Sequence, residues 1–234
     1  RGLVGTPSDF GLRAQPPSHP QLLDWLAASF IADGWSLKKL HRKIMLSATY
    51  QQSSNDRVEY VKADPANTLL WKMNRQRLSF ESLRDTILQA SGHLDLKVGG
   101  RPVKIHTHPA STRRTLYGFI DRQNLPAVFR TFDFANPDTH CPKRFENTVP
   151  QQALFLMNGS FVHDQVKFFI QQKEFMDAAN DKAKLRFLHQ TIFQRNPSTT
   201  EIQEALVFVS PKGTASWADY AQVLLLSNEV RFVD

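Results

Sequence analysis

Apolar residues recur at helical spacing twice within the first fifty positions. The first series starts at Pro20, a residue that suits the first turn of a helix, and stops before Gly34, which suits a left-handed C-cap. Its apolar positions are Leu22, Leu23, Leu26, Phe30 and Ile31. Ser36 can cap a second helix. The apolar positions of that helix are Leu37, Leu40, Ile44, Met45 and Leu46. Because the connection is short, we predict an αα-hairpin, and we expect both apolar stripes to belong to the core.

Residues 79–120 predict one further helix, a loop and one short strand. A helical segment opens at Ser79 and ends at Gly92. Residues 92–112 lack periodicity and contain several glycines and prolines, so we expect a loop there. The run 114–120 is the best strand candidate, and it is too short to imply a large sheet.

After an irregular stretch at 133–150, the pattern is helical almost to the end of the chain. Five helices are predicted there, the first of them from Gln151. The residues expected to cap the other four are Ser160, Asn180, Ser198 and Ser216. Glu201 would complete a capping box with Ser198, and Asp219 would complete a weaker one with Ser216.

The pattern as a whole predicts a mainly α fold: an irregular multi-helix domain of about eight helices, with an αα-hairpin near the N-terminus, long loops and at most a small β element. We expect one α-helical domain over residues 1–234. The alternative is a subdivision into residues 1–92 and 113–234 around the irregular loop.

Composition narrows the range of chemistry. The chain has 234 residues, of which 41% are apolar and 22% charged, and no apolar run approaches the length of a membrane span. The single cysteine, Cys141, excludes an internal disulfide, a zinc site built on several thiolates, and covalent c-type haem, which needs two cysteines. We therefore expect no metal and no cofactor within this segment.

Basic residues are concentrated in one part of the chain. The whole sequence has a net charge of +7, and the segment 97–144 alone has nine Lys and Arg against three Asp and Glu. Such a surplus can attract phosphates, sulfates or carboxylates. The candidate anion-binding residues are Arg113, Arg114, His140, Lys143 and Arg144. They would converge if residues 133–150 folded over the predicted strand. The alternative is that the arginines hold loops and helix ends together.

Cys141 is the candidate reactive thiol, because His140, Lys143 and Arg144 would favour its thiolate. The alternative is a small buried apolar side chain. A metal site that combined His106 and His108 with His140 and Cys141 is disfavoured, since more than thirty residues separate the two pairs. No nucleic-acid motif is present, so nucleic acid is not an expected partner.

Several runs of the sequence are recognisable. The most specific are His19-Pro20-Gln21-Leu22-Leu23-Asp24-Trp25, Asp64-Pro65-Ala66-Asn67, Arg75 to Leu78, Glu81-Ser82-Leu83-Arg84-Asp85, Arg113-Arg114-Thr115-Leu116-Tyr117, Phe132-Asp133, Cys141-Pro142-Lys143-Arg144 and Thr148-Val149-Pro150-Gln151-Gln152. In this order, over nearly the whole chain, they resemble the C-terminal domain of unknown function of large secreted proteins from planctomycetes and related bacteria.

This resemblance implies an exported protein, associated with the periplasm or the cell envelope. It also implies further domains upstream, often including a c-type cytochrome domain, so haem c is expected only in such an upstream domain. The family's opening helix is expected to precede Arg1. No established set of catalytic residues comes with the resemblance.

Two classes of function follow. The first is a non-catalytic helical module that docks onto the upstream domains of the same polypeptide. The second is part of a redox or hydrolytic enzyme that acts on an anionic substrate through the basic 97–144 region. If that region binds without chemistry, its expected ligand is an anionic glycan or a small anion. A large exposed apolar patch would favour docking, and a deep basic pocket would favour the enzyme.

Overall fold

A computed structural model describes residues 2–9, 11–210 and 214–233. The chain divides into two compact units, an N-terminal one up to Gln76 and a C-terminal one over Arg77–Val233. The described residues form twelve α-helices, two short 3-10 helices and one two-stranded sheet, which confirms the mainly α fold. The irregular 92–112 segment lies within the C-terminal unit, whereas the predicted subdivision used it as a boundary.

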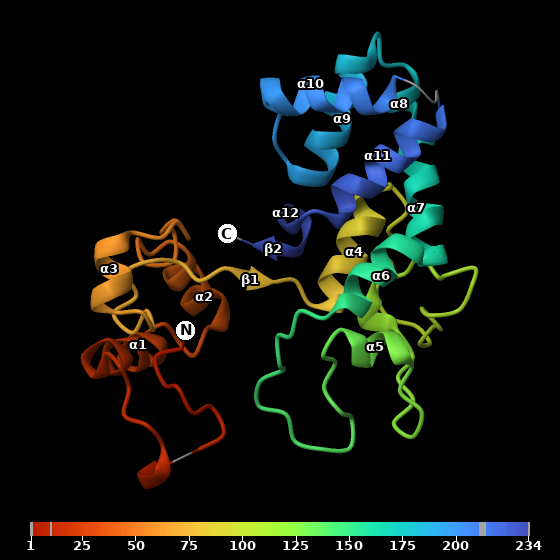
Figure 1. Ribbon diagram of the computed structural model, residues 1–234. Helices are drawn as coiled ribbons and strands as arrows, with labels where there is room; N and C mark the ends of the chain where they lie inside the picture. Colours follow the sequence, from red (N-terminus) through yellow and green to blue (C-terminus); the bar gives the residue numbers. More distant parts are fainter. Residues whose placement is uncertain (1, 10, 211–213, 234) are drawn as a thin grey trace. The chain divides into compact units, whose positions relative to one another are not determined.

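The N-terminal unit contains the predicted hairpin (Figure 1). Its elements are η1 (Gly11–Arg13), α1 (Pro20–Ala32), α2 (Leu37–Met45) and α3 (Val58–Ala63). Gly34 ends the first helix with a left-handed φ of +73°, and the Ser36 hydroxyl accepts a hydrogen bond from the Lys39 backbone N–H at the start of α2. The predicted turn and cap are therefore confirmed.

The expectation that the stripes of α1 and α2 belong to a core is wrong. Neither helix has a buried residue, and Trp35, Leu37 and Leu46 are each more than 60% exposed. Among the described residues of this unit, the buried side chains are polar, Ser54 and Asn67. Helical periodicity shows which residues share a face, and burial depends on what packs against that face.

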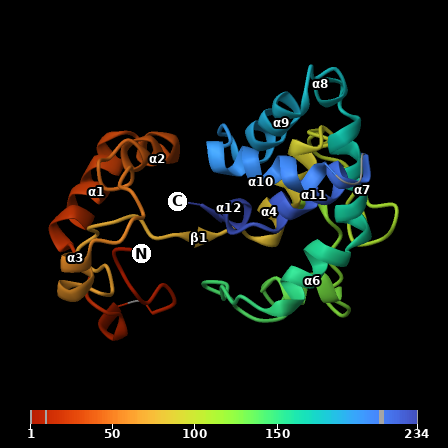
Figure 2. The same cartoon turned by 45° about the horizontal axis from the view of Figure 1, so that its top comes forward.

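The C-terminal unit contains the hydrophobic core. Figure 2 shows the helices that surround it. Its elements are β1 (Gln76–Arg77, at the unit boundary), α4 (Phe80–Ala90), η2 (Thr115–Tyr117), α5 (Ala127–Thr131), α6 (Pro150–Asn158), α7 (Ser160–Gln171), α8 (Lys173–Met176), α9 (Asp181–Phe193), α10 (Thr199–Val209), α11 (Thr214–Leu226), α12 (Asn228–Arg231) and β2 (Phe232–Val233). The two strands pair with each other.

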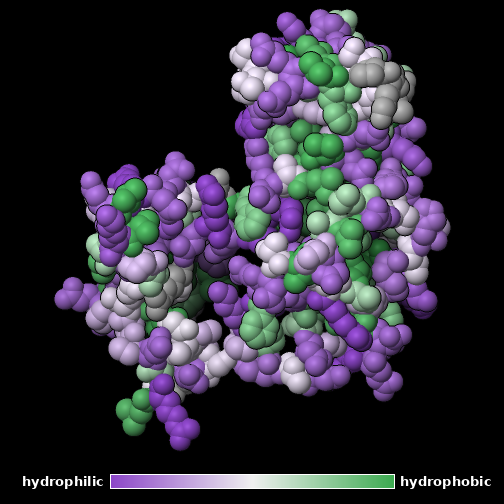
Figure 3. Space-filling view, viewed as in Figure 1, coloured by the Kyte–Doolittle hydropathy of each residue, from purple (hydrophilic) through white to green (hydrophobic). Residues whose placement is uncertain are grey.

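The core forms where α4 and α11 pack against α7. Fully or almost fully buried residues come from all the long helices of this unit, including Ile87, Leu156, Phe169, Leu188 and Ala221. Figure 3 shows that apolar residues also lie at the surface of both units, among hydrophilic ones. The long helices and the core between them hold α4 rigidly, and α4 carries most of the charged contacts described below.

Three predicted caps are confirmed and two are wrong. Ser36, Asn180 and Ser198 each accept a backbone N–H at a helix start, and Ser198 forms the capping box with Glu201. Ser79 also caps its helix, α4. Ser160 is instead the first residue of α7, after Gly159 at the N-cap. Ser216 lies buried inside α11, which begins two residues earlier, so Ser216 and Asp219 form no capping box.

The predicted strand at 114–120 is also wrong. Thr115–Tyr117 is a 3-10 turn, and the flanking chain makes single bridges to neighbouring loop residues. The Asp85 carboxylate of α4 accepts a hydrogen bond from the Thr115 backbone N–H in this turn. The eight helices of nine residues or more are those that the sequence predicts, and the four short helices were not predicted.

Candidate functional site

Arg84 on α4 is the most buried charged side chain among the described residues, with 2% of its surface exposed. Its guanidinium donates to the Arg113 carbonyl at 3.0 Å, to the Thr115 hydroxyl at 3.1 Å and to the Ser111 carbonyl. It also lies over the Phe161 ring, 5.1 Å from the ring centre. Burial lowers the pKa of Arg84 to about 10, so it remains a cation at neutral pH.

Two carboxylates of the same helix bind two of the predicted arginines. Asp85 accepts hydrogen bonds from the backbone N–H and the hydroxyl of Thr115, each at 2.7 Å, and lies 3.5 Å from the Arg114 guanidinium. One turn earlier, both oxygens of Glu81 accept from Arg144, at 2.8 and 3.0 Å. Arg114 and Arg144 thus reach neighbouring acids on α4, through contacts within the protein.

Arg113 binds backbone carbonyls and not a carboxylate of α4. Its guanidinium donates to the carbonyls of Lys97 and Gly99, at 2.9 and 2.6 Å, and stacks over the Tyr117 ring at 4.2 Å. Its side chain therefore closes the 97–101 loop.

The remaining predicted residues lie on the surface. His140 and Lys143 are exposed, and Cys141 is half-buried, with its thiol donating to the Lys143 carbonyl at 3.3 Å. The three arginines of the predicted set already have protein partners, as the loop-holding alternative expects. Anion binding by the set, and reactivity of the thiol, stay predictions.

A second polar network, which sequence reasoning missed, surrounds Asp133. This carboxylate accepts from Arg77 at 2.8 Å and from the backbone and side chain of Asn147 at 2.9 and 3.0 Å. Arg77 and Arg231 also donate to the buried Gln152, at 2.7 and 3.3 Å. Burial alone would raise the pKa of Asp133, but the hydrogen bonds from Arg77 and Asn147 outweigh it and lower the pKa. The available sequence signal was that Arg77, Asp133 and Gln152 all lie in recognisable runs.

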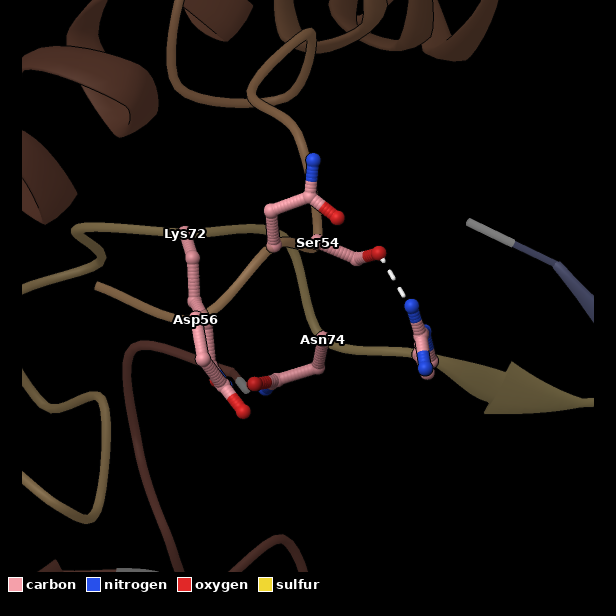
Figure 4. Close-up of a pocket in the computed structure, with 6 residues that line it drawn as sticks. Ser54, Asp56, Lys72 and Asn74 are labelled. Atoms are coloured by element: carbon pink, nitrogen blue, oxygen red, sulfur yellow. Dashed lines mark hydrogen bonds and ion pairs between the residues drawn. The ribbon is translucent and has the colours of Figure 1, made fainter. Parts of the chain in front are cut away.

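The N-terminal unit has an open polar pocket of about 310 Å³ (Figure 4). It is lined by Ser54, Asn55, Asp56, Lys72, Asn74 and Arg75. Lys72 forms an ion pair with Asp56, and the Arg75 Nε donates to the Ser54 hydroxyl at 3.3 Å. A hydrolytic enzyme was one of the two expected classes of function, and glycoside hydrolysis ordinarily needs two carboxylates. The lining of this pocket contains one, Asp56. The pocket lining therefore offers hydrogen bonds and an ion pair, but not the two carboxylates of that reaction.

Asn67 shapes the chain beside this pocket. It is buried and adopts a left-handed φ of +50°, which asparagine tolerates better than most residues. Its amide donates to the Lys72 carbonyl at 2.8 Å and to Asn74 Oδ1 at 3.1 Å, and its oxygen accepts from the Trp71 N–H at 2.9 Å. The recognisable run that ends at Asn67 is thus a structural support.

Helix α2 presents a face that is both basic and apolar. A shallow groove on it is lined by Lys38, His41, Arg42, Met45 and Leu46. All five side chains are exposed, with Leu46 at 66%. The helix has four Lys and Arg and no acid. The carboxylate of Asp33 pairs with Lys43, so it does not neutralise the cations of the groove.

The family comparison covers most of the chain. The model of the family PSD1, protein of unknown function (DUF1553), matches residues 1–209. The chain belongs to this family. No curated protein and no solved structure matches it. The match confirms the resemblance to a domain of unknown function that the motifs gave.

In the part that the structure describes, no three His, Cys, Asp or Glu side chains gather as a metal site would require. Within the same residues, no helix has both the length and the hydropathy needed to cross a bilayer.

Proposed function

We propose that this PSD1 domain is a non-catalytic docking module, and that α1 and α2 bind an acidic and apolar surface of a neighbouring domain in the same exported polypeptide. The observation that carries the proposal is the exposure of the apolar stripes of both helices. Apolar burial is the main favourable term in folding, and no apolar side chain among the described residues of the N-terminal unit is buried. A partner that covered these side chains would supply the missing burial.

The positive charge of the α2 face favours an acidic partner. The α2 face combines the cations Lys38 and Arg42 with the apolar Met45 and Leu46, and it contains no carboxylate. Opposite charges at the rim of an interface favour association and exclude partners of like charge. An acidic helix or surface with an apolar centre fits this face, and a basic one does not.

The contacts of the arginines weaken the case for the enzyme alternative. Arg114 and Arg144 pair with carboxylates of the same unit, which offsets part of the positive charge that suggested an anionic substrate. Arg113 binds backbone carbonyls of the same unit. The location in the periplasm or cell envelope, and the neighbouring domain itself, are parts of the same proposal and rest on the likeness to secreted multidomain proteins.

A synthetic peptide tests the proposal. The probe is a fluorescent amphipathic helix with leucine on one face and glutamate on the other, and its partner probe replaces every glutamate by lysine. We expect the full chain to bind the acidic peptide in a salt-dependent manner, and to bind the basic one at least tenfold more weakly.

Variants locate the binding. Met45→Glu together with Leu46→Glu should weaken acidic-peptide binding at least tenfold. Val207→Glu on α10 is the matched control, since Val207 is also exposed and apolar, and it should leave binding unchanged. Equal affinity for both peptides, or a second copy of this chain as the occupant in sedimentation experiments, would overturn the proposal.

A further inference from the structure

A cavity of about 280 Å³ in the C-terminal unit has no part in the proposed docking. It lies at the start of α7, and its walls are mainly apolar: Phe80, Ile105, Phe155 and Phe161 contribute to them. Four polar residues also line it, Arg84, His106, Thr107 and Ser160. An apolar cavity with a few polar groups is the usual form of a small-molecule site.

Arg84 gives this cavity a buried cation with an unused donor. The terminal nitrogens of its guanidinium bind Ser111, Arg113 and Thr115, but its Nε is buried and has no hydrogen-bond partner. The nearest ion-pair partner, a carboxylate oxygen of Asp85, is 3.9 Å away from a terminal nitrogen. A buried donor without a partner costs free energy, so an unpartnered Nε in a side chain that lines a cavity needs an explanation.

The start of α7 supplies a second, independent feature. The first backbone N–H groups of a helix have no partner within the helix, and here no side chain caps them. The N-cap is Gly159, where a Cβ atom would lie only 2.5 Å from the Phe155 carbonyl oxygen. The tight passage from α6 to α7 therefore excludes the Ser, Asp or Asn that would usually cap this twelve-residue helix.

We propose that this cavity binds a small carboxylate with an apolar body, such as an aromatic or branched aliphatic acid. The carboxylate binds the Arg84 Nε–H and the free N–H groups at the start of α7, and the apolar body lies against the phenylalanine walls. Charge-assisted hydrogen bonds and helix N-termini both favour such an anion. A cavity of about 150 Å³ can hold benzene, so about 280 Å³ has room for a ring and its carboxylate.

Calorimetric titration of the full chain with benzoate tests the site, with the neutral isostere benzamide and with sulfate as comparison ligands. We expect benzoate to bind, and benzamide and sulfate to bind at least tenfold more weakly. Benzamide tests the need for the charge, and sulfate tests the need for the apolar body. Absence of benzoate binding, or equal binding of either comparison ligand, would overturn the proposal.

Two variants assign the binding to this cavity. Ala110 is half-buried on the cavity wall, so Ala110→Leu should fill the space and abolish benzoate binding while the melting temperature is kept. Ala183→Leu is the control, on a half-buried alanine of α9 that does not line the cavity. Arg84→Lys keeps the charge but removes the Nε–H, and should weaken binding at least tenfold. Benzoate binding that survives Ala110→Leu would contradict the assignment, whether or not the Arg84 variant folds.

Discussion

Asp85 on α4 accepts two hydrogen bonds from Thr115, one from its backbone N–H and one from its hydroxyl, each 2.7 Å long. The preceding residue of the helix, Arg84, donates to the same hydroxyl and to the Arg113 carbonyl. The adjacent side chains Asp85 and Arg84 of α4 therefore bind both hydrogen-bond donors and acceptors of the 111–115 loop. This arrangement fixes the 111–115 chain against the core without a sheet.

Removing this contact should lower stability. Asp85→Ala leaves two donors of Thr115 without a partner, and we expect a loss of about 1–3 kcal/mol in the free energy of unfolding. Thr115→Val removes the hydroxyl alone and should cost less. Because the two side chains share a hydrogen bond, the double variant should lose less than the sum of the single losses. Urea unfolding of the four proteins measures this.

The control for that cycle is Asp219→Ala, at an exposed carboxylate of α11. It should change the free energy of unfolding by less than about 0.5 kcal/mol. Losses that add fully between Asp85 and Thr115 would mean that the hydrogen bond between the Thr115 hydroxyl and the Asp85 carboxylate contributes nothing to stability.

Arg114 and Arg144 offer a test between the two roles considered for the basic segment. Both form partly exposed ion pairs with α4, and Arg144 also lies 4.4 Å from the centre of the Phe134 ring. Replacing both by alanine should lower the free energy of unfolding by roughly 0.5–2 kcal/mol. Thermal melts in the presence of heparin, a sulfated glycan, should show the same decrease. If heparin stabilised the wild type but not the variant, anion binding would be the better account.

These contacts show what the sequence can and cannot predict. Caps such as Ser36, Asn180 and Ser198 were predictable because they act within one turn of their own helix. The bend at Thr115 was not, since it depends on Asp85, thirty residues away in the chain. Short local runs with strand-like residues adopt whatever conformation such distant partners impose.

Burial at one position predicts a pH dependence. His189 is 1% exposed, with its Nε2 2.9 Å from the Tyr220 hydroxyl, and burial lowers the pKa of His189. In the unfolded chain its pKa returns to about 6.5, so below that pH the unfolded state binds a proton that the folded state does not. Stability should therefore fall as the pH decreases below about 6.5.

Urea midpoints measured across that pH range check this. His189→Gln should be less stable at neutral pH, and its stability should depend less on pH. His140→Gln, at an exposed histidine, should keep the slope of the wild type. An unchanged slope in the His189 variant would assign the pH dependence to other groups.

Asn67 allows backbone conformation and hydrogen bonding to be separated. Asn67→Gly removes the side-chain hydrogen bonds but tolerates the left-handed φ of +50°. Asn67→Ala loses the same bonds and adds steric strain of about 1 kcal/mol. We expect both to lower the melting temperature of the N-terminal unit, followed by tryptophan fluorescence, with alanine the more harmful. Equal effects would show that the backbone conformation is not maintained in solution.

The candidate sites were less predictable than the helices. Arg84 lies between Leu83 and Ile87 on a helix, and nothing in that local pattern distinguishes a buried arginine from a solvated one. Its burial results from acceptors at Ser111, Arg113 and Thr115, which only the fold brings to it. The groove on α2 was not predicted either. Its basic and apolar residues share one face through their spacing, but the sequence pattern placed the apolar stripe of this helix in a core, and its exposure depends on what packs against it.

Zero-length carbodiimide coupling within the intact polypeptide tests the docking role most directly, because it joins lysines only to carboxylates that they touch. The ion pair between Lys43 and Asp33 serves as an internal positive control. Our account predicts that Lys38 of α2 couples to carboxylates of a neighbouring domain. Coupling of Lys38 only to carboxylates of its own N-terminal unit, while the Lys43–Asp33 product forms normally, would contradict it.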